Sequence, residues 1–393
     1  MADTAPAVLV IGAGMYVAGR GAGTDGTVLP TLMQAQARGA IGEIMVAATT
    51  RDSVEMLQGK LAELNTRLGT QVQVRGYPTG GERDPSAYQR ALEELPRPAC
   101  AIVVVPDHLH ASITADVIRA GVHPLVVKPL TPTVREAQEL INLAEAGDIY
   151  GAVEFHKRHD ESNLLLRQAL ADGRLGTPCY VTVEYSQRRM IWGVFGSWVK
   201  KTNIFQYLGV HYVDLIHFLT GARPLRVLAT GQPHDPELGE GPDFDAIQAM
   251  VEWEDPRSKR PFISTIVTSW VDPDSTSAFS DQKITVVGTQ GRYQADQKHR
   301  GVQMVTQQQG GVDDVNPYFC QTYVGADDNL GVHGYGPASI NQFLADVRDL
   351  TSGRRQRREL VGKRPSFQDA LASTAVVEAV NYSLSVGGEW VTV

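Results

Sequence analysis

The first 155 residues alternate between short apolar runs and segments whose apolar residues recur with helical spacing. Strands that alternate with helices in this way predict a parallel, doubly wound α/β sheet with helices on both faces. We expect its strands at residues 8–11, 43–49, 72–75, 101–105, 125–127 and 150–155. We expect its helices at residues 53–68, 85–95, 111–120 and 134–146. The alternation thus restricts the N-terminal domain, residues 1–155, to one class of fold.

The first expected strand is followed at once by the glycine-rich turn Gly12–Gly14. Glycines here permit a tight turn and let the backbone approach a pyrophosphate closely. The fingerprint GxGxxG is incomplete, because its third position is Val17. Glycines at positions 19, 21, 23 and 26 indicate an insertion that lengthens the loop before a helix that begins near Thr27. We expect a dinucleotide to contact Gly12, Gly14, Met15 and Tyr16.

The end of the second expected strand bears on the choice between NAD and NADP. This position often carries an acidic residue that binds the ribose 2′-hydroxyl of NAD, but Thr50 and Arg51 stand here. A guanidinium can bind a 2′-phosphate with two hydrogen bonds. The alternative is that Arg51 is a solvated residue at a helix start. We favour NADP over NAD as the cofactor.

After the fourth strand, Pro106, Asp107 and His110 come at the edge expected to face the nicotinamide half of the cofactor. His108 and His110 would also suit a metal ion, but no further cluster of histidine or cysteine lies nearby in sequence. We therefore predict no metal site, and expect His110 to line the cofactor cleft from the first turn of the next helix.

The fifth apolar run, Leu125–Val127, ends in Lys128 and Pro129. Ligands of doubly wound sheets bind outside the carboxyl ends of the strands, and Pro129 stops the strand because it lacks a backbone donor. A lysine at this edge can donate a hydrogen bond to a substrate oxygen. The alternative is that Lys128 merely ends a strand.

Beyond residue 155 the pattern changes, and strands dominate. We expect strands at residues 180–185, 225–229, 246–253, 261–270, 283–287 and 301–306, a last helix at 366–385 and a closing strand at 390–393. Successive strands with turn signals between them predict a large, mostly antiparallel sheet with one face covered. The segment 156–393 is therefore expected to form a second, α+β domain that binds substrate.

The segment between the first two of these strands is rich in aromatic and basic residues. Trp198 offers an aromatic face for a polyhydroxylated ring, and Arg158 and Asn203 are further candidate substrate-binding residues. His211 and Asp214 are three residues apart on one helix face, where the aspartate can orient a general base. A purely structural role for this pair is the alternative, and His217 is expected to be a core histidine.

Taken together, these motifs resemble the glucose–fructose oxidoreductase, inositol dehydrogenase and rhizopine-catabolism (Gfo/Idh/MocA) family. The resemblance rests on GAG after the first strand, PxxxH at 106–110, KP at 128–129, GVHYVDLIHFLTG at 209–221 and GTQGRY at 288–293. It implies a Rossmann domain, an open-faced sheet domain that builds homodimers or homotetramers, and NAD(P)-linked chemistry at a carbinol of a sugar or cyclitol.

The resemblance implies catalytic roles for Lys128 and His211, with two departures. Val127 stands where a glutamate usually precedes the lysine, and Tyr207 stands where an aspartate usually lies four residues before the histidine. The proton relay is therefore expected to use Tyr207 or Asp214. The alternatives are a redox-neutral enzyme that cleaves or epimerises glycosides with bound NAD, and a non-catalytic NAD(P)-binding regulator.

Composition excludes several other functions. The formal net charge of −8 argues against nucleic acid or an anionic membrane as the main partner. The three cysteines form no CxxC pair, which suits a reducing compartment. The N-terminus lacks the features of a signal peptide, and no apolar run approaches the length of about 18 residues expected of a membrane span. We expect a cytoplasmic protein.

Overall fold

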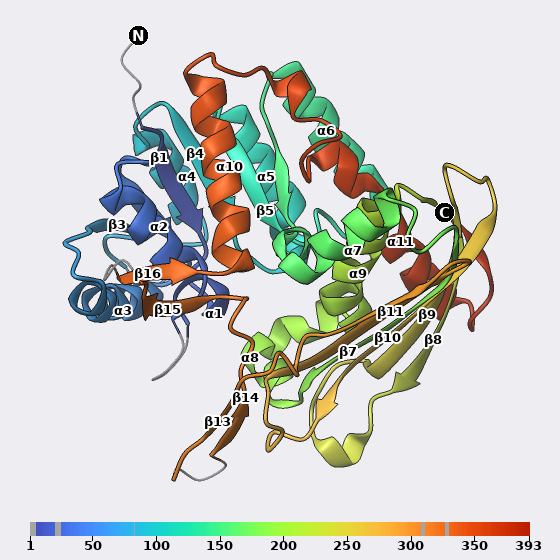
Figure 1. The fold of residues 1–393 in the computed structure, drawn as a ribbon. Helices are drawn as coiled ribbons and strands as arrows, with labels where there is room; N and C mark the ends of the chain where they lie inside the picture. Colours follow the sequence, from blue (N-terminus) through green and yellow to red (C-terminus); the bar gives the residue numbers. More distant parts are fainter. Residues whose placement is uncertain (1–4, 20–24, 82, 308–310, 327–329) are drawn as a thin grey trace. The chain divides into compact units, whose positions relative to one another are not determined.

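The computed structural model describes residues 5–19, 25–81, 83–307, 311–326 and 330–393 (Figure 1). The chain divides into two compact units. The first comprises Met1–Leu130, Arg135–His159 and Tyr318–Ala370, and the second comprises Thr131–Val134, Asp160–Pro317 and Leu371–Val393. The main crossing at His159 lies close to the expected boundary. The segment Tyr318–Ala370, which we expected in the second domain, belongs to the first unit.

The first unit contains the predicted parallel sheet, with strand order β3-β2-β1-β4-β5-β6. Every neighbouring pair is parallel, so the doubly wound fold is confirmed. The strands are β1 (Ala7–Ile11), β2 (Ile44–Ala47), β3 (Val74–Tyr77), β4 (Ala99–Val103), β5 (His123–Val127) and β6 (Ala152–Glu154). The order reverses between β1 and β4, and the crevice beyond such a reversal is where doubly wound sheets bind ligands.

The helices of this unit are α1 (Met15–Ala18), α2 (Val28–Ala37), α3 (Arg51–Leu68), α4 (Ala87–Glu94), α5 (His110–Arg119), α6 (Val134–Ala146) and α10 (Tyr335–Thr351), although Val134 itself falls in the second unit. Local signals explain the bounds of α3. The Thr50 hydroxyl accepts a hydrogen bond from the Ser53 amide at the start, and Gly69 ends the helix with a left-handed φ of 65°. The short α1 was not predicted, and positions 21 and 23 of the expected glycine insertion lie outside the described residues.

Helix α10 was also not predicted, since we expected no helix or strand between residues 307 and 365. Its apolar residues Ile340, Phe343, Leu344 and Val347 share one hydrophobic core with α2 and the sheet. Figure 1 shows α10, in orange, beside helices and strands from the N-terminal part of the chain. This core explains why a distant stretch of sequence belongs to the first unit.

The second unit is built on a seven-stranded sheet with the order β12-β11-β7-β10-β9-β8-β17. Neighbours are antiparallel except β7 and β10, which are parallel. The strands are β7 (Pro178–Arg188), β8 (Arg223–Pro233), β9 (Phe244–Glu254), β10 (Pro261–Asp272), β11 (Ser280–Gly288), β12 (Arg292–Asp296) and β17 (Val391–Thr392). A tight turn at Gly288–Gly291 joins β11 to β12, with the Gly288 amide bonded to the Gly291 carbonyl.

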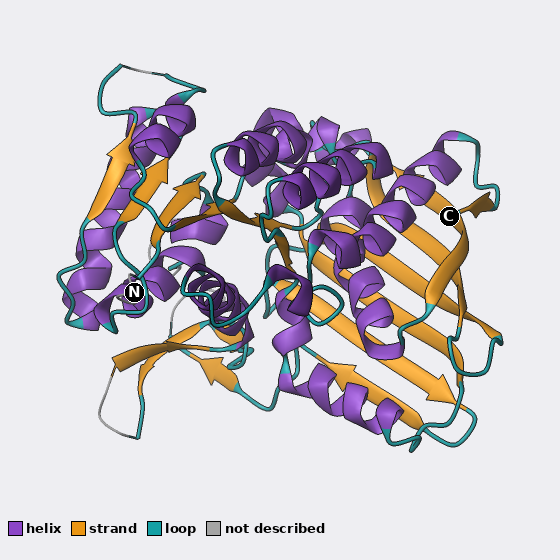
Figure 2. Cartoon of the chain, turned by 90° about the horizontal axis from the view of Figure 1, so that it is seen from above, coloured by secondary structure: helices purple, strands orange, loops and turns teal. Residues whose placement is uncertain are grey.

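Helices lie over one face of this sheet (Figure 2). They include α7 (Glu161–Ala171), α8 (Met190–Phe195), α9 (Val210–Thr220) and α11 (Phe367–Ser385, of which Leu371 onward is in this unit). Residues along β9 and β10 alternate between fully buried and more accessible, as expected for a sheet with one covered face. The predicted open-faced sheet domain is therefore confirmed.

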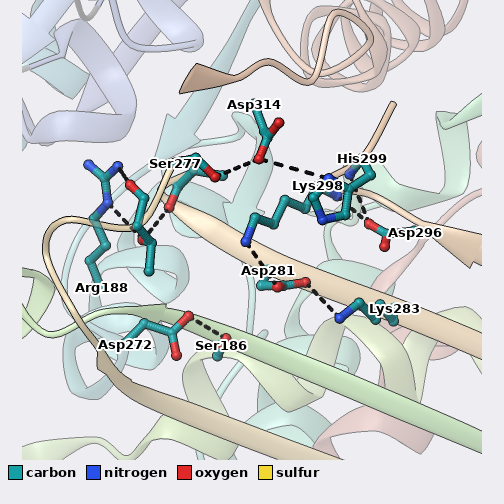
Figure 3. A network of polar contacts seen from close by, with 12 residues as sticks. Ser186, Arg188, Asp272, Ser277, Asp281, Lys283, Asp296, Lys298, His299 and Asp314 are labelled. Atoms are coloured by element: carbon teal, nitrogen blue, oxygen red, sulfur yellow. Dashed lines mark hydrogen bonds and ion pairs between the residues drawn. The ribbon is translucent and has the colours of Figure 1, made fainter. Parts of the chain in front are cut away.

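Two small hairpins complete the fold. The expected strand at 301–306 becomes β13 (Gln303–Val305), which pairs with β14 (Val312–Asp314) outside the large sheet. Strands β15 (Gln321–Val324) and β16 (Leu330–His333) form the second hairpin, in the first unit. Figure 3 shows how Asp314 anchors the first hairpin through the Ser277 hydroxyl and His299, beside a Lys298–Asp281 ion pair.

A buried ion pair in the second unit gives a stability prediction. Asp160 is fully buried and caps α7, and its carboxylate accepts hydrogen bonds from Arg300 and Gln297. Replacing Arg300 by methionine leaves this carboxylate without its cation, so the free energy of unfolding should fall by about 3–5 kcal/mol. Chemical denaturation measures the loss. The exposed pair Arg135–Glu139 is the control, and Arg135→Met should change stability by no more than about 1 kcal/mol.

Candidate active site

The glycine turn after β1 lies at the carboxyl edge of the sheet, where the strand order reverses. Gly12 has φ +117°, and a Cβ added there would lie 2.0 Å from the Val104 carbonyl oxygen. Only glycine fits this position between β1 and the end of β4. Gly14 is exposed, and a Cβ there would meet nothing within 4 Å. Gly12 is therefore packed closely against the sheet, whereas Gly14 leaves the outer surface of the turn open. Such a surface suits the close approach of a pyrophosphate.

The residues after this turn differ in exposure. Met15 is half-buried in α1, whereas Val17, at the third position of the fingerprint, is fully buried. Tyr16 has its hydroxyl buried, and burial together with the nearby Glu154 carboxylate raises the pKa of this hydroxyl well above its usual value. Val17 thus takes a packing role where the fingerprint has glycine.

Thr50 and Arg51 lie where β2 passes into α3, at the same edge of the sheet. The Thr50 hydroxyl caps α3, and Arg51 is exposed. The Arg51 guanidinium pairs with Glu55 at 2.7 Å and donates to the Thr79 carbonyl at 3.0 Å. These contacts hold the guanidinium at the surface beyond the end of β2.

Pro106, Asp107 and His110 follow β4, but His110 has surroundings different from those we expected. Its imidazole is fully buried, with Nδ1 2.7 Å from the Pro129 carbonyl and Nε2 2.9 Å from the Val105 carbonyl. Rather than presenting a free imidazole to a cofactor, His110 joins the end of β4 to the turn that contains Lys128 and Pro129. We regard it as a positioning residue for that turn.

Lys128 stands directly after β5 and is half-buried. Desolvation lowers the pKa of its amine to about 8, although the carboxylates of Asp107 and Glu154 act in the opposite direction. Such a pKa allows the group to be cationic at neutral pH while lying in a poorly hydrated place. Perturbed lysines of this kind are typical of functional sites.

Glu154, the last residue of β6, is a site residue that sequence reasoning missed. It lies opposite Val127 in the parallel register of β5 and β6, and it is almost completely buried. Burial alone would raise its pKa, but His156, Ser339 and Tyr16 together lower it below the usual value. The sequence contained a signal for this residue, because a carboxylate at the end of an otherwise apolar strand is unusual.

In the second unit, a π-helical turn, Phe205–Gly209, leads into α9. The Asn203 side chain stabilises this entry, accepting from the Gln206 amide at 2.9 Å and donating to Asn381 at 2.7 Å. His211 and Asp214 are buried in the first turns of α9, whereas Tyr207 is half-buried and packs edge-on against Phe195.

The other candidate substrate residues already have protein partners. Trp198 stacks on Phe195, with ring centroids 4.1 Å apart. Arg158 is buried in the first unit, where its guanidinium pairs with Asp369 at 2.5 Å. Sequence reasoning did not reveal these partners, which come from the same aromatic loop and from a distant segment. His217, which we expected in the core, is half-buried, with Nδ1 2.9 Å from the Ala222 carbonyl at the end of α9.

Among the residues that the structure describes, no three histidine, cysteine or acidic side chains are grouped so that they could hold a metal ion. None of the helices that these residues form is long and apolar enough to span a bilayer.

The fold and this edge of the sheet define a class, the two-domain oxidoreductases with a nucleotide-binding Rossmann sheet. A family model described as oxidoreductase family, NAD-binding Rossmann fold (GFO/IDH/MocA) matches residues 61–154, and the GFO/IDH/MocA C-terminal domain matches residues 163–294. The two models together match more than half of the chain. The chain belongs to the Gfo/Idh/MocA family.

Individual relatives are distant. An uncharacterized oxidoreductase from Schizosaccharomyces pombe is 29% identical over 117 residues, which is 29% of this chain and only about a third (32%) of that protein. An inositol 2-dehydrogenase from Rhizobium meliloti is 23% identical over 79% of this chain and 87% of its own. A solved inositol dehydrogenase homologue from Azotobacter vinelandii, complexed with NADH and myo-inositol, superposes with a TM-score of 0.70 over 99% of this chain and 98% of its own, at 19% identity. This last similarity confirms the fold.

Proposed function

We propose that this protein is an NAD(P)-dependent oxidoreductase that transfers hydride between the nicotinamide and a carbinol carbon of a sugar or cyclitol. The observation that carries the proposal is Lys128, a partly buried cation at the carboxyl edge of a doubly wound sheet, with a pKa of about 8. The glycine turn at the same edge and the inositol dehydrogenases among the relatives support it. When bound, the nicotinamide supplies the hydride acceptor or donor.

The roles of the side chains follow from their chemistry. Below pH 8 the Lys128 amine is protonated, so it can donate a hydrogen bond to the substrate oxygen and stabilise a developing alkoxide. We assign His211 as the base that takes the proton of the substrate hydroxyl, since a neutral imidazole nitrogen can accept that proton. Asp214, one turn further along α9, and Tyr207 are the candidates for orienting this histidine or passing its proton on. Each role is inferred from the surroundings within that residue's own unit.

The proposed preference for NADP rests on Arg51. Its guanidinium lies beyond the end of β2, where it is exposed to solvent and pairs with Glu55. A ribose 2′-phosphate would compete with Glu55 for this cation. No acidic residue follows β2 before Asp52, which lies inside the first turn of α3.

Fluorescence titration of the purified protein with NADPH and with NADH tests this preference, after a check for nucleotide that co-purifies. We expect tighter binding of NADPH, and Arg51→Gln should weaken NADPH binding by about tenfold, equivalent to about 1.4 kcal/mol, while leaving NADH binding unchanged. Arg90→Gln, at an exposed arginine paired with Asp84, is the control. Equal losses for both nucleotides in Arg51→Gln would contradict the assignment. Nucleotide that is retained and does not exchange would instead favour the redox-neutral reaction.

We also propose that the protein forms homodimers or homotetramers through the large sheet of the second unit. The more accessible face of this sheet mixes apolar and polar side chains, with Met250 of β9 opposite Thr265 of β10 and diagonal to Ile263 and Val267. Sedimentation equilibrium measures the oligomeric state directly.

A further inference from the structure

The loop between β3 and α4 carries an arginine to the end of β2. Arg83 of this loop forms an antiparallel bridge with Thr50, the residue directly before α3. Beside the bridge, the Asp84 amide donates a hydrogen bond of 2.8 Å to the Thr49 carbonyl. The main chain makes this hydrogen bond, so the position of Arg83 does not depend on its side chain. A basic residue from a second loop therefore lies next to Thr50.

The geometry of the bridge fixes the side from which the Arg83 side chain leaves the backbone. The hydrogen bond lies beside the Thr50–Arg83 pair and not within it, so the two residues form a non-hydrogen-bonded pair. In such pairs the Cα atoms are about 4.5 Å apart, and the side chains lie close together on one face. The Thr50 hydroxyl is 2.8 Å from the Ser53 hydroxyl at the start of α3. The exposed Arg83 side chain therefore begins beside these two hydroxyls.

The charges at this place are unevenly matched. Arg51 shares its guanidinium with Glu55. Asp84, the residue after Arg83, pairs with Arg90 of α4. Among the carboxylates that the structure describes, none forms an ion pair with Arg83. An anion that binds here would thus compete with Glu55 for one arginine and with no described carboxylate for the other.

We propose that Arg83 is a specificity-determining residue that binds the ribose 2′-phosphate of NADP together with Arg51. A phosphate monoester carries a charge of about −1.5 to −2 at neutral pH and has three strong acceptor oxygens. Two guanidiniums can therefore donate to it at once. The start of the 18-residue helix α3 favours an anion at the same place. The 2′-hydroxyl of NAD lacks this charge, so Arg83 should distinguish the two nucleotides.

The inference rests on the proposed preference for NADP and is tested by nucleotide binding, without any need for turnover. Arg83→Gln should weaken NADPH binding by about tenfold, the usual effect of losing a hydrogen bond to a charged group, and leave NADH binding unchanged. Arg83→Lys keeps the charge but not the planar fork, so its loss should be smaller. In the double variant Arg51→Gln with Arg83→Gln, the two nucleotides should bind alike. Adenosine 2′,5′-bisphosphate and adenosine 5′-monophosphate should show the same contrast without a nicotinamide.

A control and a stability measurement separate this role from a structural one. Arg119→Gln, at an exposed arginine that ends α5 and pairs with Asp116, should leave the binding of both nucleotides unchanged. Arg83→Gln should unfold at the wild-type denaturant concentration, because the hydrogen bond beside the bridge to Thr50 joins main-chain groups. A merely structural role for Arg83 predicts lower stability or equal losses for NADPH and NADH.

The outcomes distinguish the inference from the proposals on which it rests. If wild-type protein prefers NADPH and Arg83→Gln keeps the full preference, Arg83 has no part in the site and the preference rests on Arg51. Equal losses for the two nucleotides in Arg83→Gln would also overturn the inference. If wild-type protein binds NADH as tightly as NADPH, both the preference and the role of Arg83 fail. Hydride transfer between NAD and a sugar or cyclitol would still support the proposed oxidoreductase in that case.

Discussion

Replacing Lys128 by methionine is expected to lower kcat by about 10²–10³-fold, the usual effect of removing one donor to a developing oxyanion. Methionine keeps the length and apolar stem of the lysine side chain while removing its charge, so the packing at the end of β5 should be preserved. Nucleotide binding depends on the glycine turn after β1 and should change little. Steady-state kinetics with cyclitols and sugars, together with the nucleotide titration, measure both effects.

His211→Asn is the companion variant in the second unit, and loss of a general base should lower kcat by about 10²–10⁴-fold. Lys363→Met, at an exposed lysine of the first unit, is the matched control and should be fully active. If kcat remains at the wild-type value in both Lys128→Met and His211→Asn, the proposed mechanism is wrong. If the Michaelis constant alone rises, the two residues bind substrate and do not act in the chemical step.

Most of the parallel sheet was predictable because its central strands are buried on both faces and therefore read as continuous apolar runs, whereas the edge strand β3 contains the exposed Arg75. All five residues of β1 and all five of β4 are buried, and α3 begins at a side-chain cap and ends at a left-handed glycine. These are local signals that survive without knowledge of tertiary contacts. The positions of Lys128 and of the glycine turn were also predictable. Each directly follows a strand of the parallel sheet, and the carboxyl ends of these strands lie at one edge of the sheet.

What sequence reasoning missed depends on contacts between distant segments. Helix α10 is stabilised by packing in the core of the first unit, whose other buried residues, apart from Leu360, lie between Val8 and Ala152. Glu154 was missed, because the register that sets it opposite Val127 cannot be read from either strand alone. Arg158 is a different case. In the sequence it is a candidate cation for substrate binding, whereas in the structure its guanidinium pairs with Asp369.

His110 has contacts that its sequence motif does not reveal. Its spacing from Pro106 suggested a residue that lines the cofactor cleft, yet both of its ring nitrogens face main-chain carbonyls. A side chain that holds the turn after β5 affects Lys128 without touching a ligand. Motif residues of this site therefore divide into those that face the open edge of the sheet and those that fix its loops.

The two glycines of the turn after β1 should respond to the same substitution in opposite ways. In Gly12→Ala the new Cβ would lie 2.0 Å from the Val104 carbonyl oxygen, at a φ of +117° that alanine rarely adopts. The clash is with backbone, so β1 or β4 must move, and the hydrogen bond of 2.8 Å from the Val104 amide to the Ile11 carbonyl would be strained. We expect the free energy of unfolding to fall by about 2–5 kcal/mol, the sum of a strained conformation and local overpacking.

In Gly14→Ala the backbone already has an ordinary φ of −77°, and the new methyl group meets no protein atom within 4 Å. This variant should unfold at the wild-type denaturant concentration but bind nucleotide about tenfold more weakly, since the methyl would occupy the surface that a pyrophosphate approaches. Denaturation curves and nucleotide titrations of both variants measure the contrast. Because this variant should remain fully folded, weaker nucleotide binding could not be attributed to loss of folding. Undiminished nucleotide binding in Gly14→Ala would show that the pyrophosphate does not lie on this turn.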